Sequence, residues 1–290
     1  MKIALVTTLP ALIENKRIKE EVEKLGHKFS LIDMREFGFK VVDGKLTADQ
    51  ITDIKADVVI VRGVFLAIKT ISEIVNSLRT RGVKIFDNNF LEHRYSIDKV
   101  TDLVKLAVDG IMVPDCVYSR DFKDYPKLAT KLGYPFVLKS SRMGKGASVY
   151  KIESEKELND FVNRAEGEGK SAKSYILQEF IPYICDLRVL VVGDEVYTMR
   201  RIPAKGEFRA NFSLGGKVET YNLDSEGKRL AIKALSAIDM SVGGVDILIT
   251  KDDKRYVLEV NHTAGFVGME KATGENIGKV YVEHAIASAK

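Results

Sequence analysis

Over roughly the first ninety residues, strand-like segments alternate with helical patterns. This alternation restricts the folds that the chain can adopt. The strand-like segments stand at residues 3–6, 29–32, 58–61 and 83–86. Between them, two stretches repeat apolar residues at helical spacing, and Gly26 and Gly82 follow these stretches as stop signals. Strands that alternate with helices favour a small parallel sheet with helices on both sides. The sequence therefore predicts an α/β fold.

The remainder of the chain is richer in turns. Expected strands occupy residues 136–139 and 147–152, and expected hairpins turn at residues 193–194 and 251–254. A helical pattern ends before Gly110, and Ser154 with Glu157 forms a capping box that opens another helix. Further helical patterns cover residues 230–238 and 280–286. After the parallel region, the chain thus mixes hairpins with covering helices.

Composition and charge exclude several classes of protein. The 290 residues are 45% hydrophobic and 30% charged, and the net charge of +4 comes from scattered basic residues. This balance indicates a folded globular protein and argues against nucleic acid as a partner. The only cysteines, Cys116 and Cys185, have no spacing typical of a disulfide framework or a zinc site, so we expect reduced thiols. No apolar stretch approaches the roughly 18 residues of a membrane helix, and the start does not resemble a signal peptide. We therefore expect a cytoplasmic protein.

The last predicted hairpin carries an acidic pair. If its turn is centred between Asp252 and Asp253, antiparallel pairing places Asp246 opposite Glu259, and Asn261 faces the same side. Two opposed carboxylates repel each other unless a cation lies between them. Magnesium suits this position because it uses one or two carboxylates together with substrate phosphates. The alternative is that one acid pairs with a nearby arginine and the other is solvated.

A glycine-containing loop at residues 140–146 lies between two expected strands. Its glycines permit close approach to an anion, and Lys145 adds positive charge. A plain hairpin turn is the alternative interpretation. Lys139 ends an apolar strand, where it either reaches water or holds a phosphate. Lys99 begins a helix, and its charge opposes the helix dipole there, which indicates an anionic partner.

Basic residues gather in the hairpin that turns at residues 193–194 and in the segment after it. These are Arg188, Arg200, Arg201, Lys205 and Arg209. Arginine binds carboxylate and phosphate groups through two parallel hydrogen bonds. A solvated strand face is the simpler reading for any one member. The set as a whole favours an anion site near the acidic pair.

Taken in order, these segments resemble the ATP-grasp superfamily and, within it, the RimK-like alpha-L-glutamate ligase group. The similar stretch runs over roughly residues 96–282. Its motifs stand at residues 136–139, 177–181, 186–193, 206–211, 243–248, 258–261 and 268–274. The triplet Asn261-His262-Thr263 is similar instead to the LysX-like amino-acid ligases.

The resemblance implies an architecture and a set of site residues. A small N-terminal α/β domain would span residues 1–92, and two α+β subdomains, 93–175 and 176–290, would grip ATP. The implied ATP-binding residues are Lys99, Lys139, Gly144, Lys145, Gly146, Gln178, Glu179, Phe180, Ile181, Asp186, Arg209 and Asn211. Arg209 and Arg188 would be catalytic. Asp246, Glu259 and Asn261 would bind Mg²⁺, with Mn²⁺ as the alternative metal.

The same resemblance implies an ATP-dependent ligase that joins a carboxylate to an amine through an acyl phosphate. It would add L-glutamate to the C-terminal carboxylate of a protein, peptide or coenzyme tail, and it would assemble as a dimer or tetramer. A LysX-like ligase that acts on an amino-group carrier protein is the first alternative. An ATP-grasp-like small-molecule kinase and a non-catalytic nucleotide-binding protein are alternatives of other classes.

Overall fold

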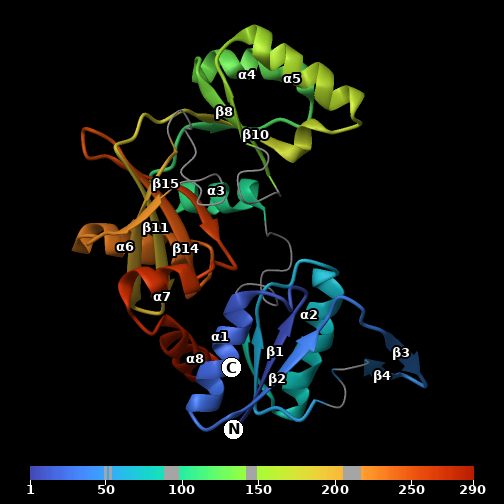
Figure 1. Cartoon of the computed structure of the whole chain (residues 1–290). Coiled ribbons are helices and arrows are strands. Elements are labelled where there is room, and N and C mark those ends of the chain that lie inside the picture. The colour runs from blue at the N-terminus through green and yellow to red at the C-terminus, as the bar shows by residue number, and fades with distance from the viewer. Residues whose placement is uncertain (49–50, 52–53, 88–97, 142–148, 205–216) are drawn as a thin grey trace.

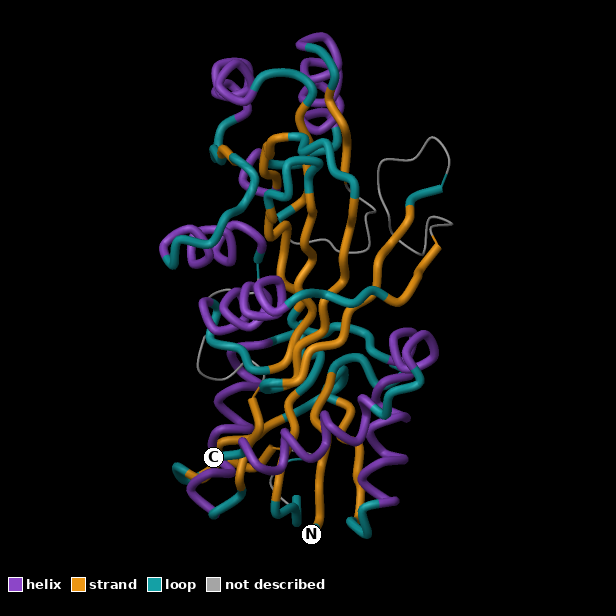
Figure 2. The backbone as a smooth tube through the Cα atoms, turned by 90° about the vertical axis from the view of Figure 1, so that its left-hand side faces the viewer, coloured by secondary structure: helices purple, strands orange, loops and turns teal. Residues whose placement is uncertain are grey.

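The computed structural model describes residues 1–48, 51, 54–87, 98–141, 149–204 and 217–290. Within these ranges the chain forms three larger sheets and one separate hairpin. The N-terminal and central sheets lie at opposite ends of an elongated molecule, with the C-terminal sheet between them (Figure 1). Figure 2 shows the same arrangement from the side, with both termini near one end.

The N-terminal sheet is parallel and has the strand order β2-β1-β5-β6. Its elements are β1 (Lys2–Thr7), α1 (Ile13–Lys24), β2 (Lys28–Asp33), β5 (Val58–Val61), α2 (Ile68–Asn76), a 3-10 helix (Ser77–Arg81) and β6 (Lys84–Asp87). Alternate residues of β1 and β5 pack against α1 on one face and against α2 on the other. The parallel sheet with helices on both sides is thus confirmed.

A short hairpin, β3 (Phe39–Val42) with β4 (Lys45–Ala48), projects from this unit and was not predicted (Figure 1). Its turn is Asp43–Gly44, and both residues have a positive φ. An Asp-Gly pair in this conformation is a strong hairpin signal, because the turn matches the twist of the flanking strands. That signal was available in the sequence.

The central sheet is antiparallel, with the order β7-β10-β8-β9. Its strands are β7 (Cys116–Val117), β8 (Phe136–Ser140), β9 (Val149–Ile152) and β10 (Tyr175–Glu179), and α4 (Tyr125–Leu132) and α5 (Glu155–Gly167) cover it. Two 3-10 turns, Phe122–Asp124 and Ala172–Ser174, lie in the connections. The predicted helix start is confirmed, because the Glu157 N–H donates to Ser154 Oγ at 3.3 Å.

The C-terminal sheet is also antiparallel, with the order β13-β12-β11-β14-β15. Its strands are β11 (Cys185–Val192), β12 (Glu195–Ile202), β13 (Lys217–Thr220), β14 (Val242–Ile249) and β15 (Arg255–Asn261). Its helices are α3 (Lys99–Val108), α6 (Ser225–Ala237), α7 (Val267–Thr273) and α8 (Ile277–Ser288). One buried cluster joins α3, through Leu106, to α6 and this sheet.

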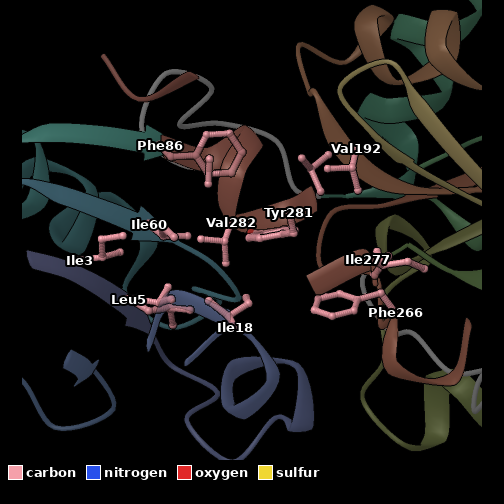
Figure 3. Close-up of a cluster of buried hydrophobic side chains, with 14 of the residues drawn as sticks. Ile3, Leu5, Ile18, Ile60, Phe86, Val192, Phe266, Ile277, Tyr281 and Val282 are labelled. Atoms are coloured by element: carbon pink, nitrogen blue, oxygen red, sulfur yellow. The ribbon is translucent and has the colours of Figure 1, made fainter. Parts of the chain in front are cut away.

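The N-terminal and C-terminal units share one continuous core (Figure 3). Ile3, Leu5 and Ile60 of the parallel sheet meet Phe266 and Val282 of the C-terminal unit within a single buried cluster. The backbone of Lys290 also exchanges two hydrogen bonds with Ile85 of β6, at 2.8 and 3.1 Å. These contacts fix the N-terminal unit against the sheet that carries the acidic pair.

A single substitution in this shared core should weaken both units together. We expect Phe266→Ala to lower the free energy of unfolding by about 3–5 kcal/mol, because Phe266 is fully buried and its removal leaves a cavity. The measurement is urea unfolding followed by probes in both units. The control is Phe65→Ala, since Phe65 is 44% exposed and should change stability by less than about 0.5 kcal/mol. Loss of the C-terminal transition alone would contradict a shared core.

Candidate active site

The acidic pair lies where the sequence placed it. Asp246 of β14 pairs directly with Glu259 of β15, and Gly244 pairs with Asn261 two residues further along. The register near the turn differs from the predicted one, because a β-bulge lies between Asp246 and Ile247 and shifts the pairing by one residue. The expected opposition is therefore produced by a bulge, a feature often found next to active sites.

Two arginines hold the Asp246 carboxylate. Arg188, directly opposite on β11, donates from Nε and also from Nη2, the latter at 2.8 Å to Oδ2. Arg201 of β12 lies 3.1 Å from the same Oδ2 and is itself buried. The two guanidinium groups fix the carboxylate from two sides. In the alternative to a metal site, one acid pairs with an arginine and the other is solvated. The first half of that alternative is confirmed for Asp246, and the second half is wrong, because Glu259 pairs with Lys99.

Asp186 was expected to meet the nucleotide, and in the structure its carboxylate is engaged by Arg201. The Arg201 Nε donates to Asp186 Oδ1 at 2.7 Å, and both side chains are buried. Burial raises the pKa of Asp186 to about 6, although the neighbouring guanidinium opposes that shift. Arg201 therefore bridges Asp186 and Asp246, and a direct contact of Asp186 with a nucleotide stays a prediction.

Two lysines from outside β14 and β15 converge on Glu259. The Lys99 ammonium, on the first residue of α3, donates to Glu259 Oε2 at 2.6 Å. Lys139, on β8 of the central sheet, is 6% exposed, and its Nζ donates to the backbone oxygen of Leu258 at 3.4 Å. Burial alone would raise the pKa of Glu259, but the two ammonium groups outweigh it and lower that pKa to about 2. Glu259 is therefore held as a carboxylate at the junction of two sheets.

Lys139 has an unusual protonation equilibrium for a lysine. Burial lowers the pKa of Lys139 to about 8, although the charge of Glu259 opposes the shift. Further negative charge nearby would stabilise the ammonium form of this buried lysine. A phosphate group beside Lys139 would supply that charge.

The donor set fits a magnesium ion that arrives with phosphate oxygens. Two carboxylates and the Asn261 amide share one face of the hairpin. The described residues contain no group of three or more acidic, histidine or cysteine side chains that could hold a metal without other ligands. Asn261 Nδ2 is buried and has no hydrogen-bond partner in the described ranges. A Cβ at Gly244, opposite Asn261, would come within 2.9 Å of Ala264 Cβ and 3.3 Å of Arg188 Cδ, so the glycine keeps this face open. Magnesium commonly completes its shell with phosphate and water.

The balance of charge also favours a ligand that is negative overall. Within the described ranges, the cationic side chains of the site outnumber the carboxylates. The carboxylates are Asp186, Asp246 and Glu259, and the cations are Lys99, Lys139, Arg188 and Arg201. A bare divalent cation would add to this excess of positive charge, whereas a metal–polyphosphate complex would offset it.

The segment expected to form the adenine hinge connects the central and C-terminal sheets. Gln178 is buried in β10, and its Nε2 finds no hydrogen-bond partner among the residues that the structure describes. The Glu179 N–H donates to a backbone oxygen just before β7 at 2.7 Å, and Ile181 is buried. The Lys151 ammonium lies 4.8 Å from the centre of the Phe180 ring. The position is that of a hinge, and adenine recognition there stays a prediction.

Several predicted site residues lie outside the described residues. These are Gly144, Lys145, Gly146, Lys205, Arg209 and Asn211. The strands β8 and β9, expected on either side of the glycine-containing loop, are both present. Arg200, another of the basic residues in the hairpin that turns at residues 193–194, donates to the backbone oxygen of Ile184 at 3.1 Å.

Two features of the site were missing from the predicted set. Arg201 was predicted only as one of five basic residues that favour an anion site. Its pairing opposite Asp186 follows from the tight turn at residues 193–194. The second is a buried contact between Asp102 of α3 and His262, which follows directly after β15, at 2.9 Å. No local pattern indicates a contact between residues 160 positions apart.

Comparison with known proteins identifies the family of the chain. The model of the RimK-like ATP-grasp domain matches residues 96–285. A protein named probable alpha-L-glutamate ligase from Trichodesmium erythraeum is 29% identical over 298 residues, which is 98% of this chain and 95% of that protein. A protein of the same name from Methanococcoides burtonii is 29% identical over 301 residues, with 100% and 97% of the two chains covered.

Solved structures with a similar fold are also ATP-grasp proteins. The ATP-grasp ligase PsnB, complexed with a minimal precursor, has a TM-score of 0.75 at 20% identity, with 98% of each chain covered. The RimK domain protein from Sphaerobacter thermophilus has a TM-score of 0.74 at 17% identity, with 98% of this chain and 99% of that chain covered. At these identities the likeness concerns the fold.

The family model and the names of the sequence relatives agree on one class of enzyme, the ATP-grasp ligases. Because the matching domain covers more than half of the chain, the protein belongs to the RimK-like ATP-grasp family. In the described part of the chain, no helix has the length and apolar character needed to cross a membrane.

The bridging role of Arg201 can be tested through stability. We expect Arg201→Met to lower the free energy of unfolding by about 3–5 kcal/mol, because it removes the guanidinium group that hydrogen-bonds to the buried carboxylate of Asp186. The loss should be smaller at about pH 5 than at about pH 8, since the raised pKa of Asp186 lets its neutral form appear at the lower pH. The measurement is urea unfolding at both pH values. Arg200→Met, at the neighbouring and less buried arginine, is the control, and equal losses in both variants would contradict the assignment.

Proposed function

We propose that this protein uses Mg²⁺ and ATP to join the amino group of L-glutamate to a carboxylate, and that the acceptor is the C-terminal end of a peptide, a protein or a coenzyme tail. The observation that carries the proposal is the opposed pair Asp246 and Glu259, set among lysines and arginines in excess. The choice of glutamate is supported by the names of the sequence relatives. A peptide acceptor is supported by the PsnB structure with precursor peptide, which has the same fold.

Asp246, Glu259 and Asn261 would hold the metal, and Lys99 and Lys139 would contact the phosphates. When bound, Mg²⁺ supplies charge neutralisation and orientation of the phosphate oxygens. Lys139 then keeps its proton beside the added negative charge, and Arg188 and Arg201 hold Asp246 in position. These residues orient and neutralise, and none of them needs to form a covalent bond.

The reaction proceeds in two substitutions. A carboxylate oxygen of the acceptor attacks the γ-phosphorus of ATP, the bond to ADP breaks, and an acyl phosphate forms. The glutamate nitrogen then attacks the acyl carbon, inorganic phosphate leaves, and the nitrogen loses a proton as the amide forms. Exclusion of water matters at this stage, because water would hydrolyse the acyl phosphate.

The direct test is turnover of ATP by the purified protein with Mg²⁺, single amino acids and candidate acceptors. We expect equal amounts of ADP and inorganic phosphate and a product heavier by one glutamyl residue, measured by mass spectrometry. A stable phosphorylated product would identify a kinase instead. Incorporation of a different amino acid onto an amino-group carrier would favour the LysX-like alternative, to which Asn261-His262-Thr263 is similar.

Glu259→Gln should abolish turnover while the protein stays folded. The amide removes a negative ligand from the proposed metal site but still accepts a hydrogen bond from Lys99. The depressed pKa of Lys139 allows that lysine to lose its proton when the carboxylate is gone. Activity and the unfolding midpoint are measured together, with Glu195→Gln, at an exposed position of β12, as the control. Full activity of Glu259→Gln would disprove the metal assignment.

Nucleotide affinity should fall as the pH rises through the pKa of Lys139, which is about 8. Above that pH the side chain is neutral in the free protein, and protonating it on binding consumes free energy. We expect Mg·ADP to bind about tenfold more weakly at pH 9 than at pH 7, as measured by calorimetry. In Lys139→Met the affinity should be lower at both pH values and nearly independent of pH. An unchanged pH dependence in that variant would show that another group titrates.

A further inference from the structure

Asp102 and His262 form a buried polar contact that the proposed reaction does not use. The His262 Nε2 and Asp102 Oδ2 atoms lie 2.9 Å apart, and each residue is 6% exposed. Buried polar groups of this kind are retained only when each has a partner, because an unpaired one destabilises the fold. The contact joins helix α3 to the end of β15, immediately after Asn261.

Helix α3 occupies an unusual place, since its first turn contacts both sheets of the site. The Lys99 N–H donates to the backbone oxygen of Ser141, just after β8, at 3.0 Å. The Lys99 ammonium reaches Glu259 on β15. Asp98 caps the helix by accepting from the backbone N–H groups of residues 100 and 101. The position of this turn therefore determines where the Lys99 charge lies.

Lys99 and Asp102 are three residues apart, so they project from the same face of α3. Their partners, Glu259 and His262, are likewise three positions apart along the adjoining segment. The helix is thus attached to β15 at two points, one of them a partly buried ion pair and the other a fully buried contact. Movement at the buried point would carry the Lys99 ammonium with it.

We propose that His262 is a positioning residue which, through Asp102, fixes the first turn of α3 so that the Lys99 ammonium stays at Glu259 and at the phosphates of the bound nucleotide. This role rests on the proposed function, because it assigns Lys99 to the nucleotide. It differs from a purely structural role in one respect: the benefit of His262 to binding depends on Lys99.

A double-mutant cycle separates these two roles. Calorimetry would give the affinity of Mg·ADP for the full-length protein and for His262→Gln, Lys99→Met and the double variant. We expect His262→Gln to weaken binding about tenfold or more, as is usual for a residue that orients a ligand-binding group. In the Lys99→Met background, the further loss should disappear. Independent losses that multiply in the double variant would overturn the proposal.

Matched controls keep the result specific to this pair. Asp102→Asn should weaken Mg·ADP binding as His262→Gln does, because it disturbs the other partner of the same contact. His284→Gln removes a histidine contact of the same length at a more exposed position, between Nε2 and Ser241 Oγ at 2.9 Å, and should leave affinity unchanged. Equal weakening by His284→Gln would show a general effect of histidine loss and would overturn the proposal.

A measurement without nucleotide distinguishes failure of this inference from failure of the proposed function. Absence of Mg·ADP binding by the unaltered protein would contradict the proposed function. Hydrogen exchange of the free protein would then decide the positioning role, with α6 (Ser225–Ala237) as an internal reference. We expect His262→Gln to speed exchange at the start of α3 and to leave α6 unchanged. Unaltered exchange in α3 would overturn the inference.

Discussion

The structure depends on holding two carboxylates, Asp246 and Glu259, side by side on the last two strands of an antiparallel sheet. Opposed like charges destabilise a strand pair, so this arrangement persists only with nearby cations. Those cations come from different parts of the chain. Arg188 and Arg201 belong to the same sheet, whereas Lys99 is brought by a helix and Lys139 by the central sheet. Neutralising the acidic pair therefore also joins the separate parts of the site.

The bulge in β15 connects this electrostatic constraint to the backbone. The register at the turn would pair Asp246 with Leu258, and the extra residue of the bulge places Glu259 opposite Asp246 instead. The Leu258 backbone oxygen accepts a hydrogen bond from Lys139. A buried ammonium group needs such acceptors, because its charge is costly away from water. The same local irregularity thus positions a carboxylate and provides a partner for the lysine of the opposite sheet.

Much of this arrangement could be predicted from sequence where the pattern was local. The parallel sheet follows from periodicity, and the pairing of Asp246 with Glu259 follows from a short turn. The pairing was right although its assumed turn centre was not, since a bulge cannot be seen in an alternation of residue types. The Asp102–His262 contact could not be predicted, because it depends on how α3 packs against a strand far along the chain. The projecting hairpin was missed although its Asp43–Gly44 turn was a local signal.

The shifted pKa values of Lys139 and Glu259 express one physical situation. Glu259 keeps its negative charge because two ammonium groups lie close to it. The pKa of Lys139 is lowered because burial outweighs the attraction of the Glu259 and Asp246 carboxylates. A metal ion alone would lower the pKa of Lys139 further, because it would offset the negative charge of Glu259. A phosphate group would raise that pKa. Binding of metal and phosphate together is then more favourable than binding of metal alone. We therefore expect a site of this composition to select a metal–nucleotide complex as a unit, which is the form in which a ligase of this family would need ATP to arrive.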